Sequence, residues 1–399
     1  MRVAQINTFF INGGSTGRIV YSLSQTLNEK GIDNCVIYGV GFGEDLTTNA
    51  HLIQSRTYKR INELKARILG NHGFNNFLST KHAIAILDAF KPDIVHIHNL
   101  HGSYINLELL FKYLNEKEIP VVITLHDAWL FTGRCACFDL NECNKWMVGC
   151  GNCAYKKQYP STWLLDNSKE NFIRKKKAIK QSTKLTVVVP SMWMLKETRK
   201  SFLSGNSVMV INNGIDISCF KPMGIPKKKQ YGIEKMILAC AYNWTVSKGV
   251  QFLPRIAGCL ENGWKLVVIG NVPKSIKRDS RIVCVPNTKD KNELALWYSS
   301  ADVFINPTLE DNFPTVNIEC LACGTPCVTF DTGGAGEIVD ENTGVVIPKN
   351  DWEMLVKKAL SIHKEELTHN CVKRARDKYS ESYANDKYVS LYKSLAYEL

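Results

Sequence analysis

The sequence lacks any apolar run long enough to cross a bilayer, and its first residues, M-R-V-A-Q-I-N-T-F-F, already have the pattern of a buried strand. We therefore expect neither a transmembrane helix nor a signal peptide, because each requires a distinct hydrophobic segment. The 399 residues are 45% hydrophobic and 22% charged, which is ordinary for a soluble globular protein. This length exceeds one typical hydrophobic core, so we expect two domains.

Acidic residues are scarce relative to basic ones: 38 stand against 50, for a net charge of +12. Three clusters carry much of the basic charge: Arg56-Lys59-Arg60-Lys65-Arg67, Arg174-Lys175-Lys176-Lys177-Lys180-Lys184 and Lys227-Lys228-Lys229. Aromatic residues are not interleaved with these bases as a stacking platform would need, so nucleic acid is not an expected partner. An anionic membrane surface fits better, especially at residues 58–69, where Ile61, Leu64, Ile68 and Leu69 share one helical face. A plain solvated surface helix is an equally open interpretation of that segment.

The dinucleotide-binding spacing G-x-G-x-x-G is also missing, which argues against a dehydrogenase. The first predicted strand is followed instead by N-G-G-S-T-G at 12–17. Gly13 and Gly14 would allow a ligand to approach the backbone closely at the start of the next helix. They are therefore candidate ligand-binding residues.

Cysteines are not scarce: there are fourteen, and several fall inside predicted core elements, which indicates reduced thiols in a cytosolic protein. Five lie within nineteen residues, namely Cys135, Cys137, Cys143, Cys150 and Cys153. The C-x-C and C-x-x-C spacings resemble those of zinc knuckles, and a structural zinc would stabilise an irregular loop. Free thiols are the alternative, and we expect no catalytic metal.

The most informative stretch runs from Asp302 to Glu337, and with Ala301 in front it reads A-D-V-F-I-N-P-T-L-E-D-N-F-P-T-V-N-I-E-C-L-A-C-G-T-P-C-V-T-F-D-T-G-G-A-G-E. Its pattern predicts a buried strand at 303–306, a polar loop, a helix opened by Pro314 and ended by Gly324, and a further strand. Acidic and small residues thus gather where strands end, the edge of an open α/β sheet at which ligands bind. The N–H groups of Thr315 and Val316 could hold a diphosphate. An ordinary α/β crossover with solvated acids is the alternative.

This stretch resembles the signature of the retaining glycosyltransferases of family 4, in its polysaccharide and colanic-acid branch. Asp311 and Glu319 have the eight-residue spacing of the family's two acids, and L-A-C-G-T-P-C-V follows at 321–328. Family members usually have Glu at the first position, so either Glu310 or Asp311 could serve there. The resemblance implies the GT-B fold, with two Rossmann-like domains facing an interdomain cleft. It also implies a donor site that includes Asn312 and Phe313.

Two further positions match the family's phosphate-binding and sugar-binding motifs. N-W-T-V-S-K-G at 243–249 resembles the family's phosphate clamp, with Lys248 in place but Asn243 where an Arg is usual. His126 and Asp127 follow a strand at 120–125, and the resemblance places the His beside the donor sugar and the Asp on the acceptor side. The H-I-H of the strand at 93–98 invites a metal assignment, but core histidines are commoner and no carboxylate completes a site there.

The resemblance covers nearly the whole chain and implies three parts. Residues 1–217 would form an acceptor domain, 218–379 a nucleotide-sugar donor domain, and 380–399 a helix returning to the first domain. The implied activity is the transfer of a hexose from a nucleotide-diphosphate sugar to a growing, lipid-linked glycan, with retention of the anomeric configuration. The implied location is the cytoplasm, with peripheral association at the inner face of the cell membrane. Lys248, Asp311, Glu319 and His126 would be the catalytic residues. A nucleotide-sugar epimerase, a phosphorylase or a non-catalytic glycan-binding scaffold on the same fold are the alternatives.

Overall fold

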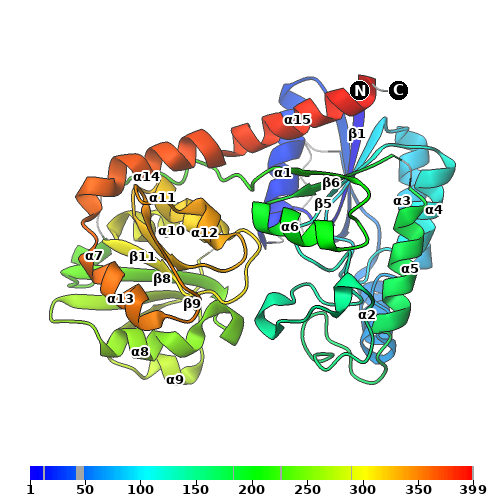
Figure 1. Cartoon of the computed structure of the whole chain (residues 1–399). Coiled ribbons are helices and arrows are strands. Elements are labelled where there is room, and N and C mark those ends of the chain that lie inside the picture. The colour runs from blue at the N-terminus through cyan, green and yellow to red at the C-terminus, as the bar shows by residue number, and fades with distance from the viewer. Residues whose placement is uncertain (12–13, 42–48, 183, 225–226, 289, 398–399) are drawn as a thin grey trace. The chain divides into compact units, whose positions relative to one another are not determined.

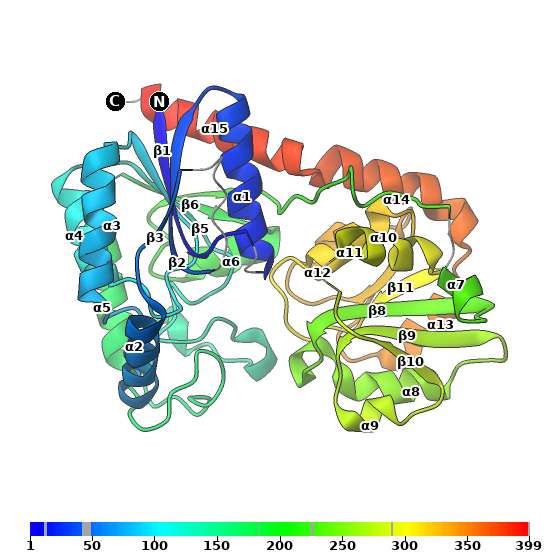
Figure 2. The same ribbon diagram turned by 180° about the vertical axis from the view of Figure 1, so that it is seen from behind.

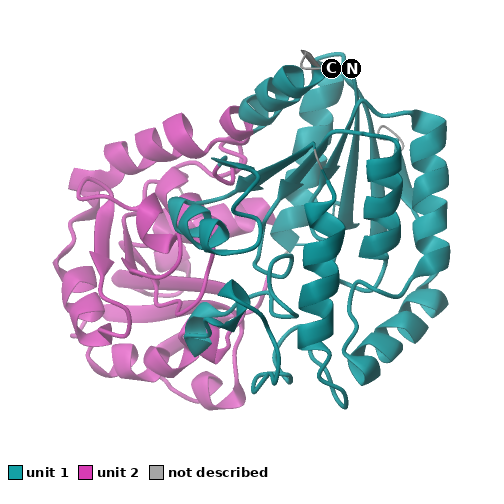
Figure 3. Cartoon of the chain, turned by 45° about the vertical axis from the view of Figure 1, so that its right-hand side comes forward, with its two compact units in different colours: residues 1–211, 385–399 teal, residues 212–384 magenta. Residues whose placement is uncertain are grey.

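A computed structural model of the chain describes residues 1–11, 14–41, 49–182, 184–224, 227–288 and 290–397 (Figure 1). It divides into two compact units, of which unit 1 comprises residues 1–211 and 385–399 and unit 2 comprises residues 212–384 (Figure 3). Each unit has its own parallel sheet and its own hydrophobic core. No helix in the described part of the chain is both long enough and apolar enough to span a membrane.

Unit 1 is built on a seven-stranded parallel sheet with the order β3-β2-β1-β4-β5-β6-β7. Its strands are β1 (Arg2–Phe9), β2 (Asp33–Val40), β3 (Ala50–Leu52), β4 (Ile94–Ile97), β5 (Val121–Thr124), β6 (Leu185–Val189) and β7 (Ser207–Val210). Its helices are α1 (Gly14–Glu29), α2 (Arg56–Leu69), α3 (Phe77–Phe90), α4 (Leu107–Glu116), α5 (Ser168–Lys180) and α6 (Met192–Lys200), with the 3-10 turns η1 (Asp139–Asn141) and η2 (Lys145–Met147). The central strands are mostly apolar and are buried along their whole length, as expected where helices cover both faces of a parallel sheet (Figure 2).

The alternation of side chains along β1 shows that both faces are packed. Ala4 and Ile6 belong to the core that includes α3 and α4, whereas Val3 belongs to a second core with α1 and the last helix, α15 (Glu381–Tyr397). Tyr392 of α15 contacts Nδ1 of the buried His96, whose Nε2 lies 2.8 Å from Oγ1 of Thr124. The histidine of β4 is therefore a core residue that helps to hold the C-terminal helix.

Unit 2 is built on a six-stranded parallel sheet with the order β10-β9-β8-β11-β12-β13. Its strands are β8 (Lys235–Asn243), β9 (Trp264–Asn271), β10 (Ile282–Val285), β11 (Val303–Asn306), β12 (Cys327–Phe330) and β13 (Gly344–Ile347). Its helices are α7 (Lys227–Gln230), α8 (Leu253–Gly258), α9 (Lys274–Lys277), α10 (Lys291–Ser300), α11 (Thr315–Ala322), α12 (Ala335–Ile338), α13 (Trp352–Ser361) and α14 (Lys364–Tyr379), with the turns η3 (Val246–Lys248) and η4 (Val250–Phe252).

The unit boundaries fall at 211/212 and 384/385, whereas the sequence interpretation placed them at 217/218 and 379/380. Tertiary contacts account for the difference. Ile215 lies in the core of unit 2 and forms a β-bridge with Ser380, so the residues around 215 and around 380 both belong to unit 2. Asn385 donates to the hydroxyls of Ser22 and Thr26 on α1, which assigns the following residues to unit 1.

Both sheets have a point where the strand order reverses: between β1 and β4 in unit 1, and between β8 and β11 in unit 2. Loops leaving the carboxyl ends of two such strands run in opposite directions and leave a crevice in which ligands of open α/β sheets bind. The two topological switch points are therefore the places where the candidate residues must be sought.

Candidate functional site

Two of the predicted residues meet at the switch point of unit 2. Lys248 ends the turn that follows β8, and Asp311 lies in the loop that follows β11. The Nζ atom of Lys248 lies 2.6 Å from Oδ2 of Asp311, and their side chains are 34% and 22% exposed. A cation and a carboxylate are thus held together at the ligand-binding edge of the sheet while still open to solvent.

The backbone around Lys248 is fixed against the loop that carries Asp311. The carbonyl oxygen of Ser247 accepts hydrogen bonds from Leu309 N at 2.8 Å and from Thr308 Oγ1 at 3.1 Å. Gly249 has a φ of +77°, and a Cβ at this position would lie only 2.1 Å from the carbonyl oxygen of Pro307. Packing therefore explains why glycine follows Lys248: only glycine allows the close approach of the two backbone segments that brings Lys248 to Asp311.

The opposite side of the Asp311 loop is supported by the loop after β12. A Cβ on Gly333 would lie 1.8 Å from the carbonyl oxygen of Asp311, and Gly334 N donates to the same oxygen at 3.3 Å. The second carboxylate oxygen of Asp311 accepts from Phe313 N at 3.2 Å. Of the two acids that the sequence left open, Asp311 is the one in contact with Lys248, while Glu310 is its half-buried neighbour.

The start of α11 lies in the same loop. Pro314 occupies the N-cap position, one residue before the helix, and supplies no side-chain cap. Thr315 and Val316 are half-buried at the first turn, and Asn312 lies at comparable exposure before the buried Phe313. Helix N-termini attract anions because the first N–H groups lack intrahelical acceptors and carry the positive end of the helix dipole. This end of α11 can therefore bind a phosphate group.

Glu319, on the second turn of α11, is buried, and its Oε2 accepts a hydrogen bond from the hydroxyl of Tyr298 at 3.0 Å. Tyr298 belongs to α10, and burial raises its pKa well above the ordinary value, so the hydroxyl keeps its proton and remains a donor. Sequence reasoning missed Tyr298. The only feature that marks Tyr298 in the sequence is its place beside Trp297 in a helix, and adjacent aromatic residues of this kind are more often part of a hydrophobic core.

Asn243, at the end of β8, is exposed and accepts from Nδ2 of Asn271 at 2.9 Å. The next residue, Trp244, is buried, and its indole N–H donates to the carbonyl of Ile269 at 2.9 Å. The tryptophan thus anchors the strand end, and the asparagine lies at the ligand-binding edge without adding a charge. An anion there would meet one side-chain cation from this segment, Lys248.

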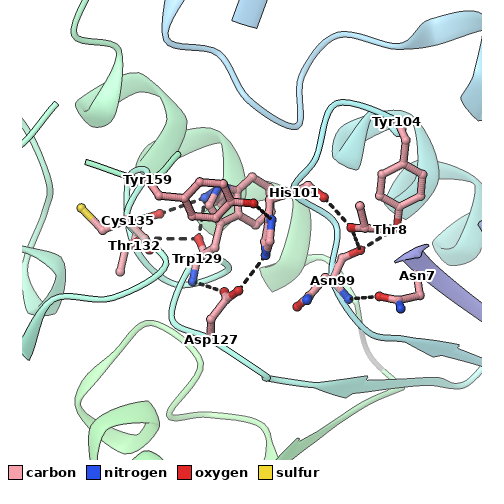
Figure 4. Close-up of polar contacts among 11 residues, drawn as sticks. Asn7, Thr8, Asn99, His101, Tyr104, Asp127, Trp129, Thr132, Cys135 and Tyr159 are labelled. Atoms are coloured by element: carbon pink, nitrogen blue, oxygen red, sulfur yellow. Dashed lines mark hydrogen bonds and ion pairs between the residues drawn. The ribbon is translucent and has the colours of Figure 1, made fainter. Parts of the chain in front are cut away.

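In unit 1 the switch point between β1 and β4 carries a polar network (Figure 4). Oδ2 of Asp127 lies 2.6 Å from Nε2 of His101, and Nδ1 of that ring lies 3.0 Å from the hydroxyl of Tyr159. The hydroxyl of Thr8, near the end of β1, donates to the carbonyl of His101 at 2.6 Å. Asp127 also accepts from Trp129 N at 2.9 Å. His101 and Tyr159 were not among the predicted site residues.

The charge state of Asp127 follows from these contacts. Burial raises its pKa, but the charge and hydrogen bond of His101 and the N–H of Trp129 outweigh burial, so the net pKa is lower than usual. The carboxylate is therefore ionised at neutral pH and already partnered. It orients His101, whose ring faces Tyr159 (Figure 4).

His126 stacks on His98, with ring centroids 5.2 Å apart and Nε2 3.0 Å from Nδ1 of His98. Burial is the main cause that lowers the pKa of His126 to about 4, with Asp127 acting in the opposite direction. A neutral imidazole suits a hydrogen bond to a sugar hydroxyl better than an ion pair with phosphate.

Gly13 lies outside the described residues, and Gly14 is the first residue of α1. Gly14 has a φ of +75°, and a Cβ added there would meet no atom within 4 Å. The left-handed backbone, rather than crowding, therefore requires glycine at this position.

The cysteine-rich loop is organised by Arg134, whose guanidinium donates to the carbonyls of Tyr155 at 2.9 Å and Lys156 at 2.8 Å. The structure describes all fourteen cysteines, and none of them forms a disulfide. A hydrogen bond from Cys135 lowers the pKa of Cys153 to about 6. Among the residues that the structure describes, no group of three or more His, Cys, Asp or Glu side chains is arranged to hold a metal ion. Zinc bound by Cys135, Cys137, Cys143, Cys150 and Cys153 stays a prediction.

Comparisons with known proteins agree with this architecture. A family model described as Glycosyltransferase Family 4 matches residues 13–218, more than half of the chain, and one described as Glycosyl transferases group 1 matches residues 234–365. A protein of Escherichia coli (strain K12) named as a colanic acid biosynthesis glycosyl transferase, WcaC, is 23% identical over 419 residues, which cover 99% of this chain and 100% of that protein.

Two solved structures show the same fold at low identity. Sucrose-phosphate synthase from Thermosynechococcus elongatus superposes with a TM-score of 0.73 at 15% identity, covering 100% of both chains. Anabaena HepE in complex with UDP-glucose has a TM-score of 0.67 at 13% identity, covering 99% of this chain and 100% of that one. With two Rossmann-like parallel α/β units, the fold is GT-B. The chain belongs to glycosyltransferase family 4.

Proposed function

We propose that the protein transfers a hexose from a nucleotide-diphosphate sugar to a growing, lipid-linked glycan, with retention at the anomeric carbon, during the synthesis of a surface polysaccharide. The observation that carries the proposal is the contact between Lys248 and Asp311 beside the start of α11, at the switch point of unit 2. The full-length similarity to WcaC supports the polysaccharide assignment. The likeness to Anabaena HepE, whose structure was solved in complex with UDP-glucose, supports a nucleotide sugar as donor.

On the donor side, the diphosphate would lie between Lys248 and the first N–H groups of α11. Asp311 would then turn from the lysine to hydroxyl groups of the donor sugar. Glu319, held by Tyr298, would accept the ribose hydroxyls. From unit 1, we assign the neutral His126 to the sugar and Asp127 to the acceptor side, where it orients His101.

The reaction breaks the bond between the anomeric carbon and the diphosphate oxygen and forms a bond from that carbon to the acceptor oxygen. Both events occur on one face of the sugar, and the departing diphosphate oxygen takes the proton of the acceptor hydroxyl. Negative charge grows on the diphosphate as the bond breaks. Lys248 and the end of α11 stabilise that charge where it develops, so we assign no step to a divalent cation.

The protein would act in the cytoplasm, at the inner face of the membrane, where a lipid-linked acceptor is exposed. The alternatives are an epimerase or a phosphorylase that uses the same donor site, or a scaffold that binds glycans without turnover. An epimerase would return a free nucleotide sugar, and a phosphorylase would require inorganic phosphate. A scaffold would give no product from any donor.

The test is a panel of nucleotide sugars. Ligand that binds the folded state raises the melting temperature, so the donor that raises it most is chosen first. That donor is then incubated with a lipid-linked or soluble glycan acceptor, and the anomeric configuration of the product is read by NMR. A glycoside with the configuration of the donor supports the proposal. An inverted glycoside, an isomerised nucleotide sugar or no product with any donor would refute it.

A further inference from the structure

Unit 1 contains a pocket of its own beside the end of its first strand. The cavity has a volume of about 200 Å³, and its walls come from β1, helix α2 and the segments 102–103 and 159–161. We call it the β1–α2 pocket, and its lining includes Thr8, Phe9, Lys59, Glu63, Arg67 and Tyr159. The carboxyl end of β1 lies at the switch point of the sheet, where ligands of α/β proteins bind. The volume has room for one sugar unit.

A chain of hydrogen bonds fixes how Tyr159 can bind a ligand in this pocket (Figure 4). The carboxylate of Asp127 is ionised and can only accept, so Nε2 of His101 carries a proton and donates to it at 2.6 Å. In the neutral imidazole Nδ1 is then an acceptor, and the hydroxyl of Tyr159 donates to it at 3.0 Å. The proton of Tyr159 is therefore committed to His101, and the phenolic oxygen is left to accept from a ligand.

Tyr159 combines this fixed hydroxyl with an accessible ring. It is 64% exposed overall, while its hydroxyl end lies against His101, whose ring it meets edge-on at 5.7 Å between centroids. Burial of that end, followed by the charges of Asp127 and Glu63, raises the pKa of Tyr159 to about 12, so the hydroxyl keeps its proton. An exposed aromatic face beside an accepting oxygen suits a sugar, which has C–H groups to pack on the ring and O–H groups to donate.

Helix α2 supplies cations to the same pocket. Lys59, Glu63 and Arg67 follow one another at intervals of one turn, and all three line the cavity. Nη2 of Arg67 donates to Oε1 of Glu63 at 2.6 Å, whereas Nζ of Lys59 lies 3.8 Å from Oε2, too far for a hydrogen bond. Within the described part of the chain neither cation has a further side-chain hydrogen bond, so the remaining N–H groups of both can bind an anion.

The deeper wall adds positive charge as well. His72 is buried, and burial is the main cause that lowers its pKa to about 4, with the charge of Arg134 lowering it further. Arg134 is itself buried, and in the described part of the chain its hydrogen bonds go to carbonyl oxygens and a sulfur rather than to a carboxylate. An anion in the pocket thus meets Arg134 and the two cations of α2, against the carboxylates of Glu63 and Asp127.

These two features call for different parts of one ligand. A neutral sugar would use the oxygen of Tyr159 but not the N–H groups of Lys59 and Arg67. A fully ionised inorganic anion would use the cations but has no O–H group to donate to Tyr159. A sugar that carries an acidic group uses both.

We propose that the β1–α2 pocket binds one sugar unit bearing an anionic group, either a carboxylate or a phosphate. The anion pairs with Lys59 and Arg67, the ring packs on Tyr159, and one ring hydroxyl donates to the Tyr159 oxygen. Binding of such a sugar does not depend on the proposed function. Its identification with the end of the glycan acceptor does rest on that function, and it implies an enzyme that extends an acidic glycan.

The first test is equilibrium binding to the whole protein, followed by saturation-transfer NMR. The probes are methyl glycosides of three hexuronic acids (glucuronic, galacturonic and mannuronic), the corresponding neutral methyl hexosides and their phosphate esters. Each charged hydrogen bond from a partly exposed side chain is worth roughly three- to tenfold in affinity, so the preferred acidic glycoside should bind at least about tenfold more tightly than its neutral counterpart. The tighter of uronide and phosphate identifies the anion. Equal affinity for acidic and neutral glycosides, or no binding of any acidic glycoside, would overturn the proposal.

The second test removes the cations one at a time. Lys59→Gln and Arg67→Gln should each weaken binding of the acidic glycoside by roughly three- to tenfold and leave binding of the neutral one unchanged. Lys65→Gln is the matched control, because Lys65 is exposed on the same helix but does not line the pocket. An equal loss in Lys65→Gln would refer the effect to net charge and refute the site. Melting temperatures check folding, and Lys59→Gln carries the test by itself if Arg67→Gln is unstable.

The third test concerns the direction of the hydrogen bond to Tyr159. Fluorine cannot donate, so the ring hydroxyls of the preferred glycoside are replaced by fluorine one at a time. In the parent protein one replacement should weaken binding by roughly two- to tenfold, the value of one neutral hydrogen bond. In Tyr159→Phe the same replacement should cause no further loss. A loss as large as that of the parent would exclude Tyr159 as the acceptor of this hydrogen bond.

Turnover separates the pocket from the proposed function. An acidic acceptor should have a lower KM than its neutral counterpart, and Lys59→Gln should raise the KM of the acidic acceptor with little change in kcat. Binding of acidic glycosides without turnover on any acceptor would keep the pocket assignment and remove the proposed function. Turnover on neutral acceptors, with no binding preference for acids, would keep the function and remove the pocket assignment.

Discussion

Replacing Lys248 by Ala should reduce turnover strongly while changing stability little. The lysine pairs with Asp311 at 2.6 Å, but the two side chains are 34% and 22% exposed. A solvent-screened pair of this kind contributes only about 0–1 kcal/mol to the free energy of unfolding. Loss of one preorganised donor to the charge of a transition state costs roughly 10²–10³-fold in kcat.

The chain supplies a matched control in Lys228. Its Nζ lies 2.8 Å and 3.0 Å from the two carboxylate oxygens of Asp302, and these side chains are 23% and 22% exposed. Asp302 precedes β11 and so lies at the opposite end of that strand from Asp311. Lys228→Ala removes a similar ion pair from unit 2, and it should lower the melting temperature at least as much while leaving kcat unchanged.

The assay is kcat and donor KM at saturating acceptor, with melting temperatures from the same preparations. A kcat of Lys248→Ala within about twofold of the parent would refute the reasoning, because the expected loss is roughly 10²-fold or more. An equal fall in kcat for Lys228→Ala would also refute it, since the effect would then follow stability or net charge rather than the site.

Three further predictions concern other parts of the molecule. Glu319→Gln should raise donor KM by roughly 10- to 100-fold with little change in kcat, since loss of a buried charged acceptor costs about 1.5–3 kcal/mol in all bound states. Tyr298→Phe should give a smaller effect in the same direction. Normal donor affinity in the folded Glu319→Gln variant would remove Glu319 from the site. If Cys135–Cys153 bind zinc, elemental analysis should find about one zinc per chain; metal-free protein of unchanged stability would favour free thiols. Burial lowers the pKa of His126 from 6.5 to about 4, so the unfolded chain binds the extra proton first. The free energy of unfolding should therefore fall as pH drops from 6.5 toward 4, and His126→Gln should flatten that dependence in denaturant titrations; an unchanged dependence would show that His126 does not contribute to it.

The sequence alone determined the strand-and-helix order around the candidate donor site, because the local patterns there are strong. The buried strand β11 has the predicted bounds, and α11 begins one residue after the predicted opening at Pro314. Proline and glycine restrict the backbone wherever they occur, so such boundaries can be read without knowing the fold. The alternating strands and helices of both halves predicted two Rossmann-like domains, and the family resemblance implied the GT-B fold. The structure confirms both.

Only the tertiary structure decided which side chains meet. Lys248 and Asp311 are 63 residues apart in the sequence. Their contact depends on the close approach of the Pro307 carbonyl to Gly249 and of the Asp311 carbonyl to Gly333, which no local sequence pattern specifies. Tyr298 reaches Glu319 from another helix, and Tyr159 reaches His101 across 58 residues. The amphipathic pattern of residues 58–69 likewise could not show which face the protein buries, because helical periodicity fixes the grouping of side chains but not their orientation toward the core. In the folded chain Ile61 and Leu64 are each 49% exposed, and backbone hydrogen bonds from Trp163 and Leu165 attach the segment at 163–165 to the end of that helix.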